Sequence, residues 1–91
     1  MKKEIMPNLP IFETSDIYLA SALRTKGLKL LDIRTDNESD RGIFMFEDTP
    51  NREKLVRDYR MGNLEGNLKS YSKNWVDLKM MVTLEVNKKW T

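Results

Sequence analysis

The chain has 91 residues with 16 basic and 14 acidic side chains, which gives a net charge of +2. Because it contains no cysteine, disulfide bonds, thiol catalysis and cysteine-ligated zinc are excluded. It also contains no histidine, so the usual metal ligand and the usual general base near neutral pH are missing. We therefore expect a protein that is not an enzyme and that uses no metal ion and no cofactor.

The length favours one domain. We expect a flexible N-terminal arm over residues 1–8 and a single α+β domain over residues 9–91. The 40% of hydrophobic residues is enough for a core. No window approaches the roughly 18 apolar residues of a membrane span, and no apolar leader follows the basic start. We therefore expect a cytoplasmic protein without membrane contact.

The predicted domain begins with a strand and a helix. Residues 9–12 are short, apolar and interrupted by proline, which suits an edge strand. A helix is predicted from about 15 to 26, with capping oxygens on Thr14 and Ser15 at its start. Gly27 stands where a left-handed residue ends a helix.

A hairpin and a second helix are predicted next. Residues 28–35 and 43–46 have strand character and are joined by a polar loop over 36–42. A change of phase within the first of these strands indicates a bulge or a strand covered on both sides. Thr49 and the proline after it then predict a helix start, and Gly62 predicts its end.

The clearest periodicity in the chain predicts a long helix over about 64–82. Its apolar residues recur at alternating steps of four and three, as in a helical packing seam. The seam consists of Leu64, Leu68, Tyr71, Trp75, Leu78 and Val82.

The last segment admits two interpretations. Val82, Leu84 and Val86 alternate with polar residues, as in a half-buried strand. The seam also reaches Val82, so the helix can instead continue. We favour a helix ending near residue 80 and a strand over 82–86. The predicted order is β-α-β-β-α-α-β, a small antiparallel sheet with two or three helices packed on it.

Three short strings resemble a known family. They are Phe12-Glu13-Thr14-Ser15-Asp16-Ile17-Tyr18-Leu19-Ala20, Lys26-Gly27-Leu28-Lys29-Leu30-Leu31 and Phe44-Met45-Phe46-Glu47-Asp48. They are similar to the motifs F-x-T-S-D-x-Y-L-A, K-G-x-x-L and F-x-F-E-D of small uncharacterised bacterial and phage proteins, a domain of unknown function. The resemblance covers about residues 12–60 and implies a bacterial or mobile-element origin without implying an activity. The 36–42 loop and the tail depart from the family pattern.

The acidic loop resembles a calcium loop only in part. Asp36, Glu38, Asp40 and Glu47 fall at ligand positions, but the required glycine is one position late and the flanks are strands instead of helices. We expect a solvated turn there and no metal site.

Basic residues concentrate on the two C-terminal helices. Arg57, Arg60, Lys69 and Lys73 can form a patch for nucleic acid, which is the alternative function that we retain. An ordinary charged helix face explains the same residues, because neighbouring carboxylates can pair with part of this charge.

Apolar side chains near the C-terminus exceed what one seam needs. They are Trp75, Val76, Met80, Met81 and Trp90. A surplus rich in methionine and tryptophan is typical of a partner-binding surface or of self-association, and core packing against the sheet explains it equally well.

The sequence therefore favours a small non-catalytic interaction protein of bacterial or mobile-element origin that binds a protein partner. One such role is anti-defence, in which the protein binds and blocks a host defence effector as anti-CRISPR-type inhibitors do. The alternative is a nucleic-acid-binding accessory protein that uses the basic helix face.

Overall fold

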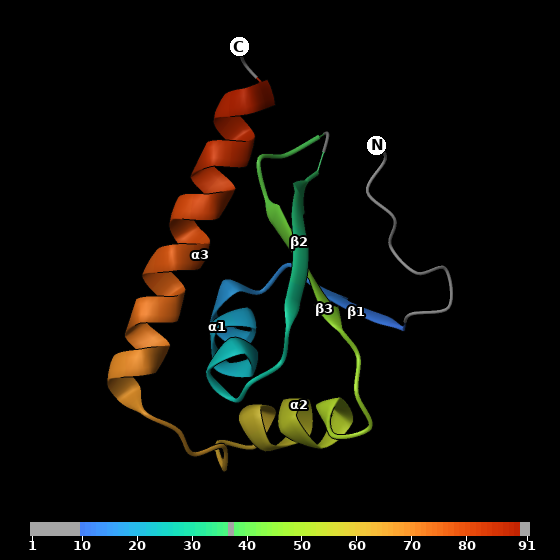
Figure 1. The fold of residues 1–91 in the computed structure, drawn as a ribbon, viewed down its shortest axis with the longest axis vertical. Coiled ribbons are helices and arrows are strands. Elements are labelled where there is room, and N and C mark those ends of the chain that lie inside the picture. Colours follow the sequence, from blue (N-terminus) through green and yellow to red (C-terminus); the bar gives the residue numbers. More distant parts are fainter. Residues whose placement is uncertain (1–9, 37, 90–91) are drawn as a thin grey trace.

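The computed structural model describes residues 10–36 and 38–89, which form a three-stranded sheet and three helices (Figure 1). The elements in chain order are β1 (Ile11–Thr14), α1 (Ile17–Thr25), β2 (Leu30–Thr35), β3 (Gly42–Glu47), α2 (Arg52–Arg60) and α3 (Leu68–Lys89). This order confirms the α+β class. It also confirms the predicted succession of elements from β1 to α3. The predicted arm over residues 1–8 lies outside the described residues.

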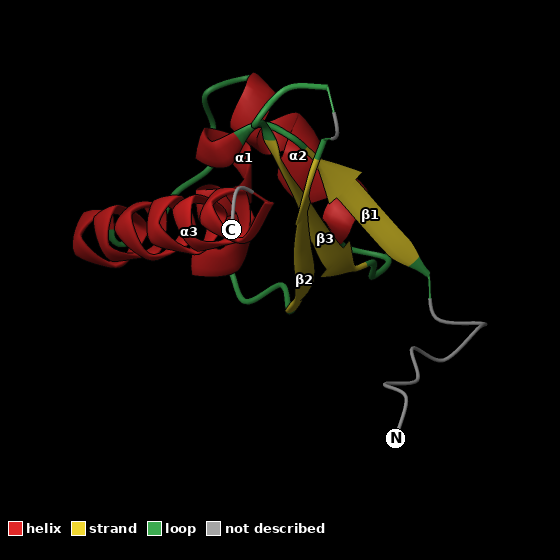
Figure 2. Ribbon diagram, turned by 90° about the horizontal axis from the view of Figure 1, so that it is seen from above, coloured by secondary structure: helices red, strands yellow, loops and turns green. Residues whose placement is uncertain are grey.

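The sheet has the order β1-β3-β2 with both pairs antiparallel, so the predicted hairpin is confirmed. A register shift between Leu30 and Asp32 marks a bulge or irregularity in β2, which favours the bulge among the two predicted explanations of the change of phase. Phe44 and Phe46 of β3 are buried, and α1 and α3 lie together on one side of the sheet (Figure 2). The core therefore forms between the sheet and these helices.

Local signals set both ends of α1. The carboxylate of Asp16 accepts hydrogen bonds from the amides of Tyr18 (2.9 Å) and Leu19 (3.2 Å), so Asp16 itself is the cap. Thr14, predicted as a possible cap, instead accepts from the amide of Asp16 (3.1 Å). Gly27 has a φ of 97° and ends the helix as predicted.

The second helix begins later than predicted. Helical residues start at Arg52, and Thr49 contributes its backbone carbonyl, which accepts from the Arg52 amide at 3.0 Å. The Arg52 guanidinium donates to Asp48 (2.9 Å) and lies 4.3 Å from the ring centre of Phe12. These contacts tie the start of α2 to β1. The hydrogen bond to Asp48 raises the pKa of Arg52 above its usual value.

The core draws on every helix and on two strands, but unequally. Five consecutive residues of α1, from Leu19 to Leu23, are buried. Among the described side chains of α3, Leu78 is the one fully buried member of the core cluster, and Met81 and Val82 pack partly against the cluster. The shorter helix therefore lies at the centre of the fold and the longer one at its side.

The predicted strand over residues 82–86 is wrong, because α3 continues as a helix to Lys89. The reason lies at Gly42, the first residue of β3. A Cβ atom at Gly42 would lie 2.5 Å from Cγ2 of Val82, so the helix passes directly over the missing side chain. Val82 thus continues the helical seam, and this tertiary contact overrides the strand preference of the β-branched residues.

Candidate protein-interaction surface on α3

An apolar row lies on the solvent side of α3. Val76, Met80 and Leu84 follow one another at intervals of four residues, which places them side by side along the helix. Their exposed fractions are 51%, 59% and 57%. Single exposed apolar residues are ordinary, but three in a row form a continuous strip. We call Val76, Met80 and Leu84 the α3 stripe.

The opposite side of α3 is fixed to the rest of the fold. Leu78 is fully buried, and the ring of Trp75 stacks on Tyr18 of α1 with 6.4 Å between ring centres. The amide of Asn74 also donates to the hydroxyl of Thr25 at 3.0 Å. Because these contacts hold the helix in one rotation, the stripe cannot turn inward to bury itself.

The structure separates the five residues predicted to bind a partner. Val76 and Met80 are neighbours in the stripe. Trp75 lies on the flank facing α1, where it stacks on Tyr18, and Met81 lies on the flank facing β2. Trp90 lies outside the described residues. The exposed face therefore contains two of the predicted residues together with Leu84, which the strand prediction had hidden.

Two open crevices lie beside the stripe, and one of them reaches β2. One has a volume of about 240 Å³ and lies between Met81 and Glu85 of α3 and residues 30–33 of β2. The other has a volume of about 390 Å³ and is lined by Met81, Leu84 and Glu85 among others. Because both share Met81 and Glu85, the C-terminal half of α3 offers a hollowed surface beside the stripe.

The charge of α3 differs from that of the remaining chain. The helix contains five lysines and two carboxylates, hence +3, whereas the whole chain carries only +2. Asp77 and Glu85 are half-buried, and each forms an ion pair with a lysine of the same helix. Asp77 pairs with Lys73 at 3.1 Å, and Glu85 pairs with Lys88 at 3.2 Å. Lys79 lies 5.8 Å from the ring centre of Trp75. Lysines therefore accompany the apolar stripe along α3, two of them paired with carboxylates, and the helix as a whole stays positive.

The edges of the sheet are poor alternatives for docking a partner strand. Strand β1 has four residues and directly follows Pro10, which has no amide N–H to donate. Strand β2 is packed against α3, and the Asp32 carboxylate accepts from the Ile33 amide at 2.8 Å. Short, proline-flanked and internally satisfied edges resist strand addition.

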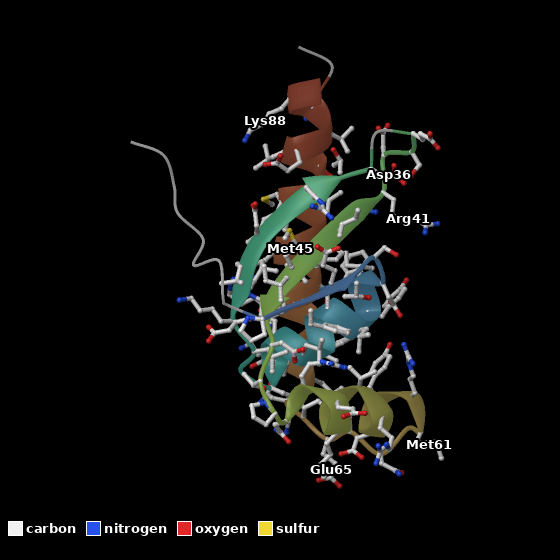
Figure 3. The ribbon with its side chains drawn as sticks, turned by 90° about the vertical axis from the view of Figure 1, so that its right-hand side faces the viewer. Asp36, Arg41, Met45, Met61, Glu65 and Lys88 are labelled. Carbon is white, nitrogen blue, oxygen red and sulfur yellow. The ribbon has the colours of Figure 1, made fainter. Side chains whose placement is uncertain are left out.

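The outer face of the sheet is crossed by an ion pair. Arg34 of β2 donates to the carboxylate of Glu13 of β1 at 3.1 Å, across the intervening β3. Met45, which is paired with Glu13 in the register, lies on β3 between these two strands (Figure 3). Charged side chains therefore border the apolar centre of this face.

The residues of the nucleic-acid alternative divide between two helices. Arg57 and Arg60 are exposed on α2, and Lys69 and Lys73 are exposed on the first turns of α3. Helix α2 packs mainly on α1, and a non-helical segment over residues 61–67 separates the two basic pairs. Lys73 pairs with Asp77 of its own helix.

Hydrogen bonds to Asp36 hold the hairpin loop together. Asp36 accepts from the amide of Glu38 (3.0 Å) and from the hydroxyl of Ser39 (3.4 Å), and its own amide donates to the carbonyl of Arg41 (3.0 Å). Within residues 10–36 and 38–89, no three acidic side chains gather to hold a metal ion. No helix in the same part of the chain combines the length and apolar character of a membrane span.

Two leucines were misplaced by the sequence patterns. Leu84 stands four residues after Met80, so extending that interval would have found it. Leu68 was assigned to the packing seam, and this is wrong because it is 81% exposed. Helix α3 begins at Leu68, and the Thr25–Asn74 contact with α1 comes almost two turns later.

A family model describing a domain of unknown function, DUF5659, matches residues 10–84. The chain belongs to this family. The match extends beyond the resemblance over residues 12–60 and includes the whole stripe. Comparison with curated proteins and with solved structures gives no match. Membership of DUF5659 thus connects the fold to a family but supplies no activity.

Proposed function

We propose that this domain is a non-catalytic protein-binding module whose docking surface is the α3 stripe. The observation that carries the proposal is three half-exposed apolar side chains in a row on a helix whose opposite side packs against α1. A preorganised apolar strip binds a partner without first being ordered, which lowers the entropic cost of association. Burying the three side chains would supply the apolar contact that interface centres need.

The partner that fits this surface is an acidic amphipathic helix. Rows of residues four apart on two helices interdigitate, so the stripe matches the apolar face of another helix. The net positive charge of α3 selects acidic side chains beside that face, because opposite charges speed encounter and like charges exclude wrong partners. A bacterial or mobile-element origin and a host defence effector as the partner stay predictions.

The test uses a designed peptide of Leu and Glu with apolar residues three and four apart, and a second peptide in which every Glu is replaced by Lys. We expect the acidic peptide to shift the amide resonances of α3 around Met80 and the basic peptide to leave them unchanged. Replacing Met80→Ser and Leu84→Ser together should weaken binding by roughly thirtyfold, the effect of losing about 2 kcal/mol at an interface centre.

Met61→Ser is the matched control. Met61 is 70% exposed but lies at the end of α2, outside the stripe, so binding should stay as in the wild type. Equal binding of both peptides would refute the electrostatic part of the proposal. Unchanged binding by the double variant would refute the stripe as the docking surface.

The alternative of nucleic-acid binding through Arg57, Arg60, Lys69 and Lys73 stays a prediction. It requires affinity that falls steeply with salt, because phosphate contacts release counterions. No observation in the fold favours it over the stripe, since the two basic pairs are on different helices.

A further inference from the structure

A second concave region lies away from the stripe, where α1 and α2 end and α3 begins. It has a volume of about 370 Å³, within the range of about 300–1,000 Å³ that is typical of small-molecule sites. We call it the corner crevice. Glu65, on its rim, lies at the end of the molecule opposite Asp36 and Lys88 (Figure 3).

Hydrogen bonds between distant segments hold the walls of the corner crevice. The ammonium of Lys26 donates to the carbonyl of Glu65 at 3.0 Å, joining the end of α1 to the segment before α3. The hydroxyl of Thr25 accepts from the Asn74 amide at 3.0 Å, joining α1 to α3. Because both contacts join residues far apart in the chain, the crevice is formed before any ligand arrives.

Two tyrosines supply aromatic surface and hydroxyl groups. The rings of Tyr59 and Tyr71 line the crevice from α2 and α3. Burial raises the pKa of both phenols, and the negative charge of Asp16 raises it further. Both hydroxyls are therefore neutral near pH 7 and can donate to a ligand. Among the described residues, neither hydroxyl has a hydrogen-bond partner.

The crevice also contains an apolar side chain that the fold leaves in water. Leu68 is 81% exposed although it lines the crevice, and Leu64 beside it is half-buried. An exposed leucine next to two partly desolvated rings gains burial only when something enters the crevice.

Charges of both signs surround the crevice. Lys26 contributes a positive charge and Glu65 a negative one, and Asp16 lies near enough to influence both tyrosines. An anionic ligand would meet the two carboxylates, and a cationic ligand would meet the lysine. We infer that the corner crevice binds a small, uncharged aromatic molecule that carries a hydrogen-bond acceptor for Tyr59 or Tyr71.

The test uses benzanilide, an uncharged compound with two aromatic rings and an amide carbonyl, together with its carboxylate and aminomethyl derivatives, which are an anion and a cation near pH 7. Binding to the full chain is followed by amide chemical shifts. We expect benzanilide to shift the resonances of residues 25–26 and 64–71 and to leave those of residues 76–84 unchanged. The charged derivatives should bind at least about tenfold more weakly.

Variants identify the groups responsible. Tyr59→Phe and Tyr71→Phe keep the rings and remove the hydroxyls, so the combined variant should bind benzanilide about tenfold more weakly. Leu68→Ala should weaken binding severalfold without loss of core packing, because this side chain is exposed. Met61→Ala is the control, since Met61 is also an exposed apolar residue, at 70%, but does not line the crevice.

Shifts outside the crevice, equal binding of the charged derivatives, or unchanged affinity in the double tyrosine variant would overturn the inference. Because the stripe takes no part in these outcomes, the two proposals fail separately.

Discussion

The two helices that cover the sheet show opposite relations between sequence and fold. Helix α1 has nine residues, and five consecutive ones are buried. Helix α3 has 22 residues, and among its described side chains one is fully buried, that of Leu78, while the stripe stays in water. The core accounts for the sequence of α1, but it accounts for only one side of α3. Core packing does not explain the exposed apolar residues on the other side of α3, so we look for the function there.

The comparison predicts that two equal substitutions have unequal effects. Leu23 of α1 is fully buried, so Leu23→Ala should lower the free energy of unfolding by about 2–5 kcal/mol. Leu84 of α3 is 57% exposed, so Leu84→Ala should change it by less than about 0.5 kcal/mol. Denaturant unfolding of both variants checks this. A loss of similar size in both would show that the two helices are equally part of the core.

A smaller effect tests how α3 is attached to the sheet. Gly42→Ala adds a methyl group where Val82 already lies, so we expect a loss of about 1–3 kcal/mol in the free energy of unfolding. Val82→Ala in the same chain should restore part of that loss, because it removes the opposing methyl groups. A double-mutant cycle measures the coupling. Additive effects would mean that α3 does not pass over Gly42.

The smallest effect concerns two tyrosines at high pH, one on α2 and one on α3. Burial raises the pKa of Tyr59 and of Tyr71 above the value of about 10 in an unfolded chain. The fold therefore favours the neutral phenols, and their contribution is complete below about pH 10. It is lost as the pH rises through the folded-state values.

Unfolding free energies measured between about pH 9 and pH 11.5 should accordingly decline for the wild type. The decline should be shallower when Tyr59→Phe and Tyr71→Phe are combined, since those rings no longer titrate. An equal decline in both proteins would show that these tyrosines are not desolvated by the fold.

How far the sequence predicts the structure differs between the same two helices. The limits of α1 follow from residues at its own ends, Asp16 and Gly27, so local chemistry suffices. The end of α3 depends on a contact between Val82 and Gly42, forty residues apart. Val82 belongs both to the alternating pattern that predicts a strand and to the seam that predicts a helix. The tertiary contact with Gly42 decides for the helix.

The candidate site was predicted in part for the same reason. The interval between Val76 and Met80 is visible in the sequence, and both are exposed in the structure. Leu84 was hidden because the strand prediction placed it elsewhere. That Trp75 is turned toward α1 depends on its stacking with Tyr18, which no local pattern contains. The charge of +3 on α3 is readable directly from the sequence once the length of the helix is known.

The measurement that tests the central claim most directly pairs stability with binding in one variant. In Met80→Ser with Leu84→Ser, we expect the free energy of unfolding to stay within about 1 kcal/mol of the wild type, because each exposed site contributes less than about 0.5 kcal/mol. The acidic peptide should bind roughly thirtyfold more weakly to the same variant. A loss of several kcal/mol in the free energy of unfolding would show that the stripe serves folding. Wild-type affinity for the acidic peptide would show that the stripe does not serve binding.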